Sequence, residues 1–257
     1  MAPRLLTLAQ WTGPDSWRST LPHSCASHVF VWITRGQGRC LLAGRRQGLG
    51  VHTALAIPAG SLFALHPTGP LFGLTCLLPA SGPSLLPDEP QLLRIADQKM
   101  QNELTALLEA MQREQNEMRP FMPDALTAQG ELLTVWLRRA LVAEGEEEVI
   151  TAGQRLVDAY CALVERDHNL GLPMQDYARR LGVTPTHLTR VCKAKCGMTA
   201  LEILNGRVLY AARDMLERTP LPAKHIAARL GFNSAAYFSR FIQNHTGRPP
   251  RALRTAA

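Results

Sequence analysis

The sequence predicts an α+β protein of two domains, in which a strand-rich N-terminal part precedes an all-helical C-terminal part. Short apolar runs broken by glycine and proline fill residues 1–80, which is the pattern of short strands. Helical spacing of apolar residues begins near residue 92, and the chain follows it throughout from residue 154. We therefore expect three segments: a first domain over 1–143, a linker over 144–152 and an all-α domain over 153–257.

The first 80 residues are expected to form a small sandwich or barrel. Residues 28–34 are β-branched and aromatic, and a glycine-containing turn follows them. Residues 53–57 form another apolar run, which Pro58 ends. Turn signals at this regular spacing are typical of all-β domains with short strands. The next segment, 79–90, holds four prolines and is expected to be a loop.

Two amphipathic helices are expected within residues 92–143. Their apolar residues recur at helical spacing, as Leu104, Leu107, Leu108 and Met111 in the first helix and Leu126, Leu133, Trp136, Leu137 and Leu141 in the second. Apolar stripes of this kind either pair two copies of the chain or cover the strand domain. The residues alone leave both alternatives open.

The charge is distributed unevenly along the chain. The protein has 28 Lys and Arg residues against 21 Asp and Glu residues, a formal net charge of +7. Residues 153–257 hold 16 of the basic and 7 of the acidic residues, a balance of +9, whereas residues 1–152 have a balance of −2. A basic domain beside a near-neutral one is typical of a protein that binds a phosphate backbone, although an anionic membrane surface would attract it too.

Other features of the composition exclude several classes of protein. There is no run of 18 apolar residues and no signal peptide, so no membrane partner is expected and the predicted location is the cytoplasm. The six cysteines show neither the CxxC spacing of a zinc site nor a disulfide framework. Cys192 and Cys196 lie one helical turn apart and are candidates for metal binding or oxidation, but we expect Cys192 to fill a core position. No catalytic motif stands out, and neither an enzyme nor a cofactor is predicted.

Residues 172–193 have the pattern of a helix-turn-helix unit. Ala178 is small enough for a second helix to cross the first closely, and Gly182 supplies the left-handed backbone that a tight turn needs. Thr184 is a good N-cap and Pro185 suits the first helical position. The second helix of the unit is expected to bury three apolar residues at i, i+3 and i+4 spacing: Leu188, Val191 and Cys192.

A second unit repeats this pattern from Pro222 onward. Ile226 points inward, Gly231 makes the turn, and Asn233 or Ser234 caps the next helix. That helix again buries apolar residues at i, i+3 and i+4 spacing: Phe238, Phe241 and Ile242. One long helix, over residues 199–217, is expected to join the two units and to fix their separation. Successive major-groove faces are about 34 Å apart, so one chain could occupy two adjacent turns on one side of the DNA.

The second helix of each unit is the element expected to enter the major groove of DNA. Arg190 and Arg240 each suit bidentate hydrogen bonds to O6 and N7 of guanine, the commonest specific contact. The short side chains beside them suit thymine methyl groups or the phosphate backbone. The predicted DNA-binding residues are Thr186, His187, Thr189, Arg190, Lys193, Ala235, Ala236, Ser239 and Arg240.

Residues from about 154 to 254 resemble the DNA-binding domain of the AraC/XylS family of bacterial transcription regulators. The matching residues are Ala178, Leu181, Gly182, His187, Leu188, Arg190, Gly197, Arg207, Ala211, Leu216, Ile226, Ala227, Gly231, Phe232, Tyr237, Phe238, Ser239, Arg240, Gly247, Pro250 and Arg254. The resemblance implies that Thr186, Thr189 and Arg190 read bases from the first recognition helix. It also implies that the second helix meets the DNA through Ala235, Ala236, Ser239 and Arg240. The chain departs from the family pattern at Ala200, Gln243 and Leu253.

The glycine and proline spacing of the first 80 residues is similar to the cupin-like effector domain common in that family. The resemblance implies a small β-barrel with a ligand pocket inside it. Four side chains are candidates to line the pocket: Trp32, Arg39, His52 and His66. Metal-binding cupins have closely spaced histidines and a glutamate on a strand, whereas the histidines here are scattered, so no metal site is expected.

These observations favour a sequence-specific DNA-binding transcription regulator that responds to a ligand. Its expected partners are double-stranded DNA, a small-molecule effector, RNA polymerase if it is an activator, and a second copy of the chain in a homodimer. One alternative is a regulator without an effector, controlled by its abundance or a protein partner, which a tightly filled barrel would favour. Another is a metal-dependent cupin enzyme fused to a DNA-binding module, against which the missing histidine-carboxylate cluster argues.

Overall fold

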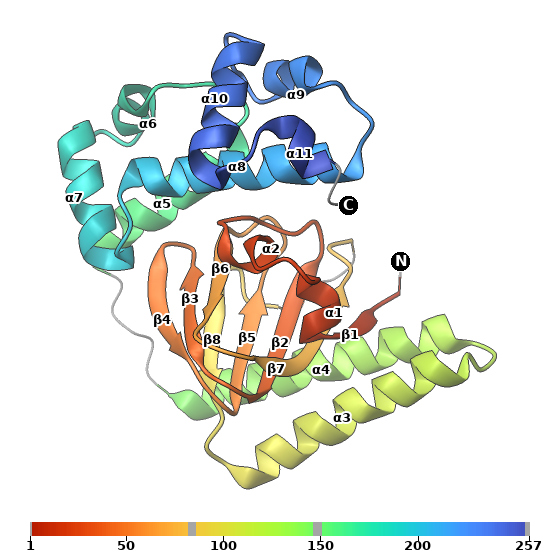
Figure 1. Ribbon diagram of the computed structural model, residues 1–257. Coiled ribbons are helices and arrows are strands. Elements are labelled where there is room, and N and C mark those ends of the chain that lie inside the picture. Colours follow the sequence, from red (N-terminus) through yellow and green to blue (C-terminus); the bar gives the residue numbers. More distant parts are fainter. Residues whose placement is uncertain (1, 82–85, 146–150, 255–257) are drawn as a thin grey trace. The chain divides into compact units, whose positions relative to one another are not determined.

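The computed structural model describes residues 2–81, 86–145 and 151–254 (Figure 1). Contacts within the chain divide it into two compact units. Unit 1 comprises Met1–Ser19, Ser24–Leu42 and Gln47–Val149, and unit 2 comprises Thr20–His23, Ala43–Arg46 and Ile150–Ala257. Most of the linker predicted over 144–152 lies outside the described residues, because these omit 146–150.

Unit 1 contains two β-sheets. The larger sheet has the strand order β1-β7-β2-β5-β8, and the smaller has the order β4-β3-β6. Every neighbouring pair in the five-stranded sheet is antiparallel. The strands are β1 (Arg4–Thr7), β2 (His28–Arg35), β3 (Gly38–Leu42), β4 (Arg45–Leu49), β5 (Thr53–Ile57), β6 (Phe63–Pro67), β7 (Phe72–Leu78) and β8 (Gln91–Arg94).

Within the described residues these strands do not close into the small cupin-like barrel that the sequence predicted, but form two separate sheets. The edge strands β1 and β8 have four residues each, so they offer few backbone groups to a further strand. The sequence also predicted helix, not strand, from residue 92, and it missed the short helices α1 (Leu8–Thr12) and α2 (Trp17–Thr20). The predicted α+β class is nevertheless confirmed.

Strand β2 is buried on both faces. Val29, Val31 and Ile33 alternate along it with Phe30 and Trp32, so the two sets point to opposite sides of the sheet. The first set packs against apolar residues of the smaller sheet: Cys40, Leu42, Leu49, Phe63 and Leu65. The second set packs against the helices on the other face. Side chains from both sheets therefore fill the space between them.

Helices α3 (Gln98–Glu117) and α4 (Met122–Glu144) form a hairpin that covers the second face of the larger sheet (Figure 1). Trp136 meets Phe30 edge-on, with ring centroids 6.1 Å apart, and its Nε1 donates a hydrogen bond to the carbonyl of Met100 over 3.2 Å. The apolar stripes predicted on these helices are buried in this layer: Leu104, Leu108, Met111, Leu126, Leu133, Trp136 and Leu137. Within one chain these stripes cover the strand domain, which is the second of the two alternatives.

The C-terminal part of unit 2 is built from helices, as the sequence predicted. They are α5 (Ala152–Asp167), α6 (Met174–Arg180), α7 (Pro185–Cys196), α8 (Ala200–Arg218), α9 (Ala223–Arg229), α10 (Ala235–Thr246) and α11 (Pro250–Arg254). The pairs α6–α7 and α9–α10 are the two helix-turn-helix units, and α8 is the long helix between them (Figure 1). A capping box of Thr199 and Glu202 begins α8, which explains why the helix starts there.

Candidate nucleic-acid interface

The first helix-turn-helix unit turns at Gly182, whose φ of +69° is a left-handed conformation that other residues rarely adopt. The hydroxyl of Thr184 then accepts a hydrogen bond from the backbone N–H of His187 over 3.2 Å. This bond satisfies one of the N–H groups that the first turn of a helix leaves unpaired. Helix α7 begins with Pro185, as the sequence predicted.

Helix α7 buries Leu188 and Cys192, and its opposite face is exposed. The exposed face borders an open groove of about 780 Å³, lined by Pro185, Thr186, Thr189, Arg190, Lys193, Ala194 and Thr199. Arg190 Nη2 donates a hydrogen bond to His187 Nδ1 over 3.2 Å. The structure therefore brings the five predicted residues of the first unit onto one face, with Thr189 half-buried at its edge.

The second unit has the same construction. Gly231 turns the chain with a φ of +72°, and the hydroxyl of Ser234 accepts a hydrogen bond from the N–H of Tyr237 over 3.1 Å. Ser234, and not Asn233, is thus the cap of α10. The helix buries Phe238 and Ile242 and presents the four predicted residues on the other side: Ala235, Ala236, Ser239 and Arg240.

The two recognition helices correspond residue by residue at an offset of 50 positions. Arg190 corresponds to Arg240, and the buried Leu188 corresponds to Phe238. Both helices end at a glycine with a left-handed backbone, Gly197 or Gly247. Their surfaces differ in charge, because Lys193 of the first helix corresponds to the uncharged Gln243 in the second.

Sequence reasoning missed one exposed residue of this surface, Tyr237. Its side chain is 56% exposed on α10, and its ring centroid lies 5.8 Å from that of Phe232. The offset of 50 positions pairs Tyr237 with His187, which the sequence did single out. That correspondence is the signal that would have found it.

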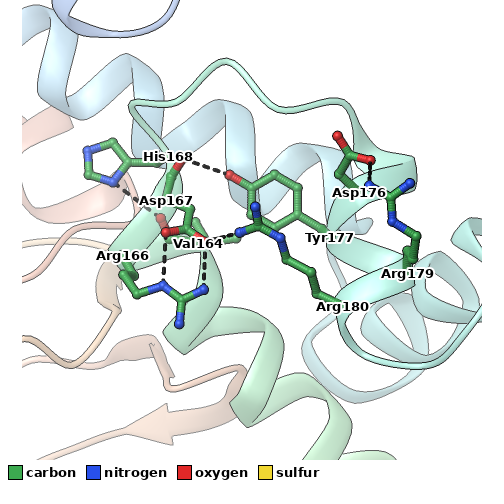
Figure 2. Close-up of polar contacts among 8 residues, drawn as sticks. All are labelled: Val164, Arg166, Asp167, His168, Asp176, Tyr177, Arg179 and Arg180. Atoms are coloured by element: carbon green, nitrogen blue, oxygen red, sulfur yellow. Dashed lines mark hydrogen bonds and ion pairs between the residues drawn. The ribbon is translucent and has the colours of Figure 1, made fainter.

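The buried carboxylate of Asp167 holds the first helix-turn-helix unit to helix α5. Asp167, at the end of α5, accepts hydrogen bonds from Arg166 over 2.9 and 2.8 Å and from Arg180 of α6 over 2.5 Å. Its backbone carbonyl accepts a hydrogen bond from the Tyr177 hydroxyl over 3.0 Å (Figure 2). The bonds from Arg166, and then the charges of both guanidiniums, hold the pKa of Asp167 below its usual range although burial raises it. The cluster fixes α6 to α5.

A second ion pair fixes the long helix α8 to α5. Arg207 donates two hydrogen bonds to the Glu165 carboxylate, over 2.6 and 2.8 Å, and both side chains are largely buried. The Tyr160 hydroxyl adds a hydrogen bond to the carbonyl of Ala200 over 2.6 Å. Bidentate pairing holds a guanidinium in one plane, so these contacts set the direction of α8.

Three buried cysteines lie on helices α5 and α7. Cys161, Cys192 and Cys196 are all buried, and burial raises the pKa of the Cys192 thiol to about 12. The prediction that Cys192 fills a core position is confirmed. Nowhere in the described part of the chain do three or more His, Cys, Asp or Glu side chains gather in a way that would hold a metal ion.

The four predicted ligand residues lie as two separate pairs in unit 1. The rings of Trp32 and His52 stack 5.8 Å apart, and Trp32 belongs to the cluster on the helix-covered face of the larger sheet. Arg39 and His66 are cross-strand partners on β3 and β6. They alternate with Cys40 and the other inward residues of the smaller sheet, so they point away from the space between the sheets. The structure does not gather the four residues around one cavity.

Comparisons with known proteins place the helix-turn-helix units in a wider group. A family model described as a helix-turn-helix domain matches residues 177–256. The probable transcription factor PqrA of Proteus vulgaris is 30% identical over 86 residues, which cover 34% of this chain and 70% of that protein. The probable bifunctional transcriptional activator/DNA repair enzyme AlkA of Mycobacterium tuberculosis is 31% identical over 144 residues, 53% of this chain but only 28% of that protein.

A solved structure is similar along nearly the whole chain. ToxT of Vibrio cholerae is 13% identical and has a TM-score of 0.46, over 98% of this chain and 96% of that one. Among the described residues, no helix combines the length and the apolar character that crossing a membrane requires.

Proposed function

The chain belongs to the AraC/XylS family of helix-turn-helix regulators, and from this premise we propose that it binds double-stranded DNA at specific sequences and regulates transcription. One observation carries the proposal. Two equivalent helices, α7 and α10, each expose a face with a central arginine, and a single helix joins their units. A helix-turn-helix protein reads DNA with such a face in the major groove.

The first recognition helix has the chemistry to read guanine. Arg190 presents a planar fork of donors, which matches O6 and N7 of that base. His187 accepts a hydrogen bond from this guanidinium, so the fork is partly oriented before DNA arrives. Thr186 and Thr189 also line the groove and suit short contacts to bases or phosphates. Lys193, one turn further along, suits a phosphate.

The second recognition helix combines one arginine with apolar contacts. Arg240 is exposed at the position equivalent to Arg190, and Ser239 lies half-buried beside it. Ala235 and Ala236 stand at the N-terminal end of the helix, where residues come closest to the base edges. Their methyl groups suit thymine. We therefore propose an asymmetric site, with a more polar readout in the first half.

The experiment that tests the function is selection of bound fragments from genomic DNA by the purified protein. We expect a motif that spans two adjacent major grooves. Arg190→Ala and Arg240→Ala should each weaken binding roughly tenfold to a hundredfold and relax the motif at one position, because a bidentate contact discriminates by about 1–3 kcal/mol. Arg113→Ala, on an exposed position of α3, is the matched control. Binding that depends on salt and not on sequence would overturn the proposal.

We propose further that unit 1 carries the response to a small-molecule effector, as effector domains of this family do. The filled space between the two sheets is the observation that favours the alternative, a regulator without an effector. A thermal-shift screen of small apolar and anionic compounds against the full chain separates the two. A compound that raises the melting temperature and changes DNA affinity supports the effector. A screen without such a compound supports control by abundance or by a protein partner.

We also propose that the protein acts as a homodimer and, where it activates a promoter, contacts RNA polymerase. The buried stripes of α3 and α4 do not serve the dimer, but a second stripe does. Five apolar residues on the opposite face of α4 recur at mostly heptad spacing, here named the outer stripe: Ala125, Ala128, Leu132, Val135 and Val142. Leu132 is 57% exposed and Val142 is 82% exposed, so the stripe has room for a partner helix.

A further inference from the structure

The loop that leads into the first helix-turn-helix unit touches the turn of the second unit, backbone against backbone, at two glycines. Gly171 lies in the loop between α5 and α6, and Gly231 makes the turn between α9 and α10. A Cβ placed on Gly171 would lie 2.1 Å from the carbonyl oxygen of Gly231, and a Cβ placed on Gly231 would lie 2.3 Å from the backbone nitrogen of Gly171. No side chain fits at either position unless one backbone moves away from the other.

The duplication of the unit supplies an internal comparison. Gly182 makes the equivalent turn in the first unit, and its φ of +69° is close to the +72° of Gly231. A Cβ placed on Gly182, however, would meet nothing within 4 Å. Both turns need a residue with a left-handed backbone. Only the second turn also needs a residue without a Cβ, because the backbone of Gly171 occupies that space. Turn chemistry alone therefore does not explain the close approach at Gly231.

Both sides of the contact are held in place. The Gly171 loop starts with a hydrogen bond from the Leu170 N–H to the carbonyl of Asp167, over 3.0 Å, and Asp167 is the anchored carboxylate of the first unit. The Gly231 turn is closed by hydrogen bonds from its own N–H to Ala228 and from the Phe232 N–H to Ala227, over 3.2 and 2.9 Å. A contact between two rigid segments transmits orientation, because neither side yields easily.

We propose that the Gly171–Gly231 contact, together with α8, fixes the relative position of the two recognition helices and so selects DNA sites with one spacing between half-sites. Helix α8 connects the units by one path, and the glycine contact adds a second path that removes rotation about the first. Gly171 and Gly231 are thus positioning residues. This inference rests on the proposed function, because spacing matters only if both helices bind one DNA site.

The first test measures affinity against spacing. The full chain is titrated onto duplexes in which the two half-sites of the selected motif are moved together or apart by single base pairs. The parent protein should show one optimum and lose roughly tenfold or more when the spacing changes by one base pair, at least as much as one mismatched base pair costs. Gly171→Ala should lose about as much at that optimum and show a flattened or displaced profile. Gly247→Ala should keep the parent's profile, because Gly247 has a similar φ, +69° against +65° at Gly171, but nothing lies within 4 Å of its Cβ position.

The outcome is decisive in either direction. A parent-like profile for Gly171→Ala, or an equal loss at every spacing, would overturn the positioning role. A second variant, with one glycine inserted after Gly171, loosens the contact without adding a side chain. It keeps the test available where Gly171→Ala does not fold, and circular dichroism establishes the folding of each variant.

The second test needs no DNA and separates this inference from the proposed function. Spin labels at the exposed, equivalent positions Ala194→Cys and Asn244→Cys report the separation of α7 and α10, in a chain whose half-buried Cys25 is changed to serine. Pulsed electron resonance should give one narrow distance for the parent and a shifted or broadened one for Gly171→Ala. An unchanged distance would overturn the positioning role. Failure of the parent to select any DNA sequence would instead overturn the proposed function.

Discussion

At the residue scale, Ala235 and Ala236 would limit what the second recognition helix reads in the proposed interface. Their side chains donate no hydrogen bond, so we expect them to discriminate between bases through contact with the thymine methyl group. We expect deoxyuridine in place of a thymine that faces them to weaken binding about fourfold, which corresponds to the ~0.8 kcal/mol of one buried methyl group. Fluorescence anisotropy with duplexes substituted at one thymine at a time measures this.

Arg190 supplies the control for that measurement. Guanine opposite an arginine is read through N7, so 7-deazaguanine there should weaken binding, whereas deoxyuridine at neighbouring positions should not. A second half-site that tolerates deoxyuridine at every thymine would contradict readout through the alanine methyl groups.

We expect Asp167 to contribute to stability and not to DNA contact. Asp167→Asn removes the charge that Arg166 and Arg180 share, and we expect a loss of about 1–3 kcal/mol in the free energy of unfolding. The lower part of that range is favoured because both guanidiniums are more than a third exposed. Asp176→Asn, which breaks the more exposed pair with Arg179 on the same helix, is the matched control and should cost less (Figure 2). Chemical denaturation measures both.

The same carboxylate makes a prediction about pH. The pKa of Asp167 is lower in the folded chain than its ordinary value, so its contribution is fully present above the ordinary carboxyl range and is lost as pH falls through the lowered pKa. The melting temperature of the parent should therefore fall more steeply below about pH 4 than that of Asp167→Asn. Parallel curves for the two proteins would show that the carboxylate adds nothing to folding.

At the element scale, the recognition helices could be predicted because their signals are local. A turn glycine, a capping hydroxyl and apolar residues at i, i+3 and i+4 all fall within one short segment, as from Gly182 to Cys192. The choice between Asn233 and Ser234 as cap was not predictable, since both side chains accept the same bond. Tyr237 was not among the predicted DNA-binding residues, because tyrosine is neither a typical core residue nor a residue that commonly reads bases.

The sheets of unit 1 could be predicted only as short strands. Strand β1 pairs with β7, which is distant in the sequence, and this register depends on tertiary packing. Strand β8 has four residues after a proline-rich stretch, too few for a period of two to stand out from a helical one. Tertiary packing also decides that Trp32 faces the helices and Val31 faces the smaller sheet. The sequence therefore could not predict that the four ligand residues lie as two separate pairs.

The outer stripe of α4 carries a prediction about assembly. Asp124 lies near the start of this helix and Arg139 near its end, so an antiparallel pair of α4 helices would bring opposite charges together along the apolar contact. We expect the full chain to be a dimer at micromolar concentration, and Leu132→Glu to be a monomer. Light scattering with and without DNA measures the mass. Ala106→Glu, on an exposed position of α3, should remain a dimer, and a monomeric parent under both conditions would contradict the pairing.

At the scale of the whole molecule, the charge balance separates affinity from specificity. Residues 153–257 have a balance of +9 and residues 1–152 have −2, so the basic domain supplies the attraction to phosphates wherever it meets DNA. This attraction is independent of sequence and weakens as salt rises. Base contacts add the preference for one site and depend little on salt. In the proposed interface the two terms belong to different residues of the same helix, the phosphate contact to Lys193 and the base contact to Arg190.

Lys193→Gln should therefore change the salt dependence of binding and leave the sequence preference intact. One phosphate contact fewer lowers the slope of log affinity against log salt by about one. The pair of Lys193 with Glu202, at 3.9 Å and with both side chains more than half exposed, is too weak to hold the amine away from DNA. Lys99→Gln, on α3, should leave the slope unchanged, and Arg190→Ala should relax the preference for one base. A lost base preference in Lys193→Gln would mean that this lysine reads a base, which would contradict its assignment to a phosphate contact.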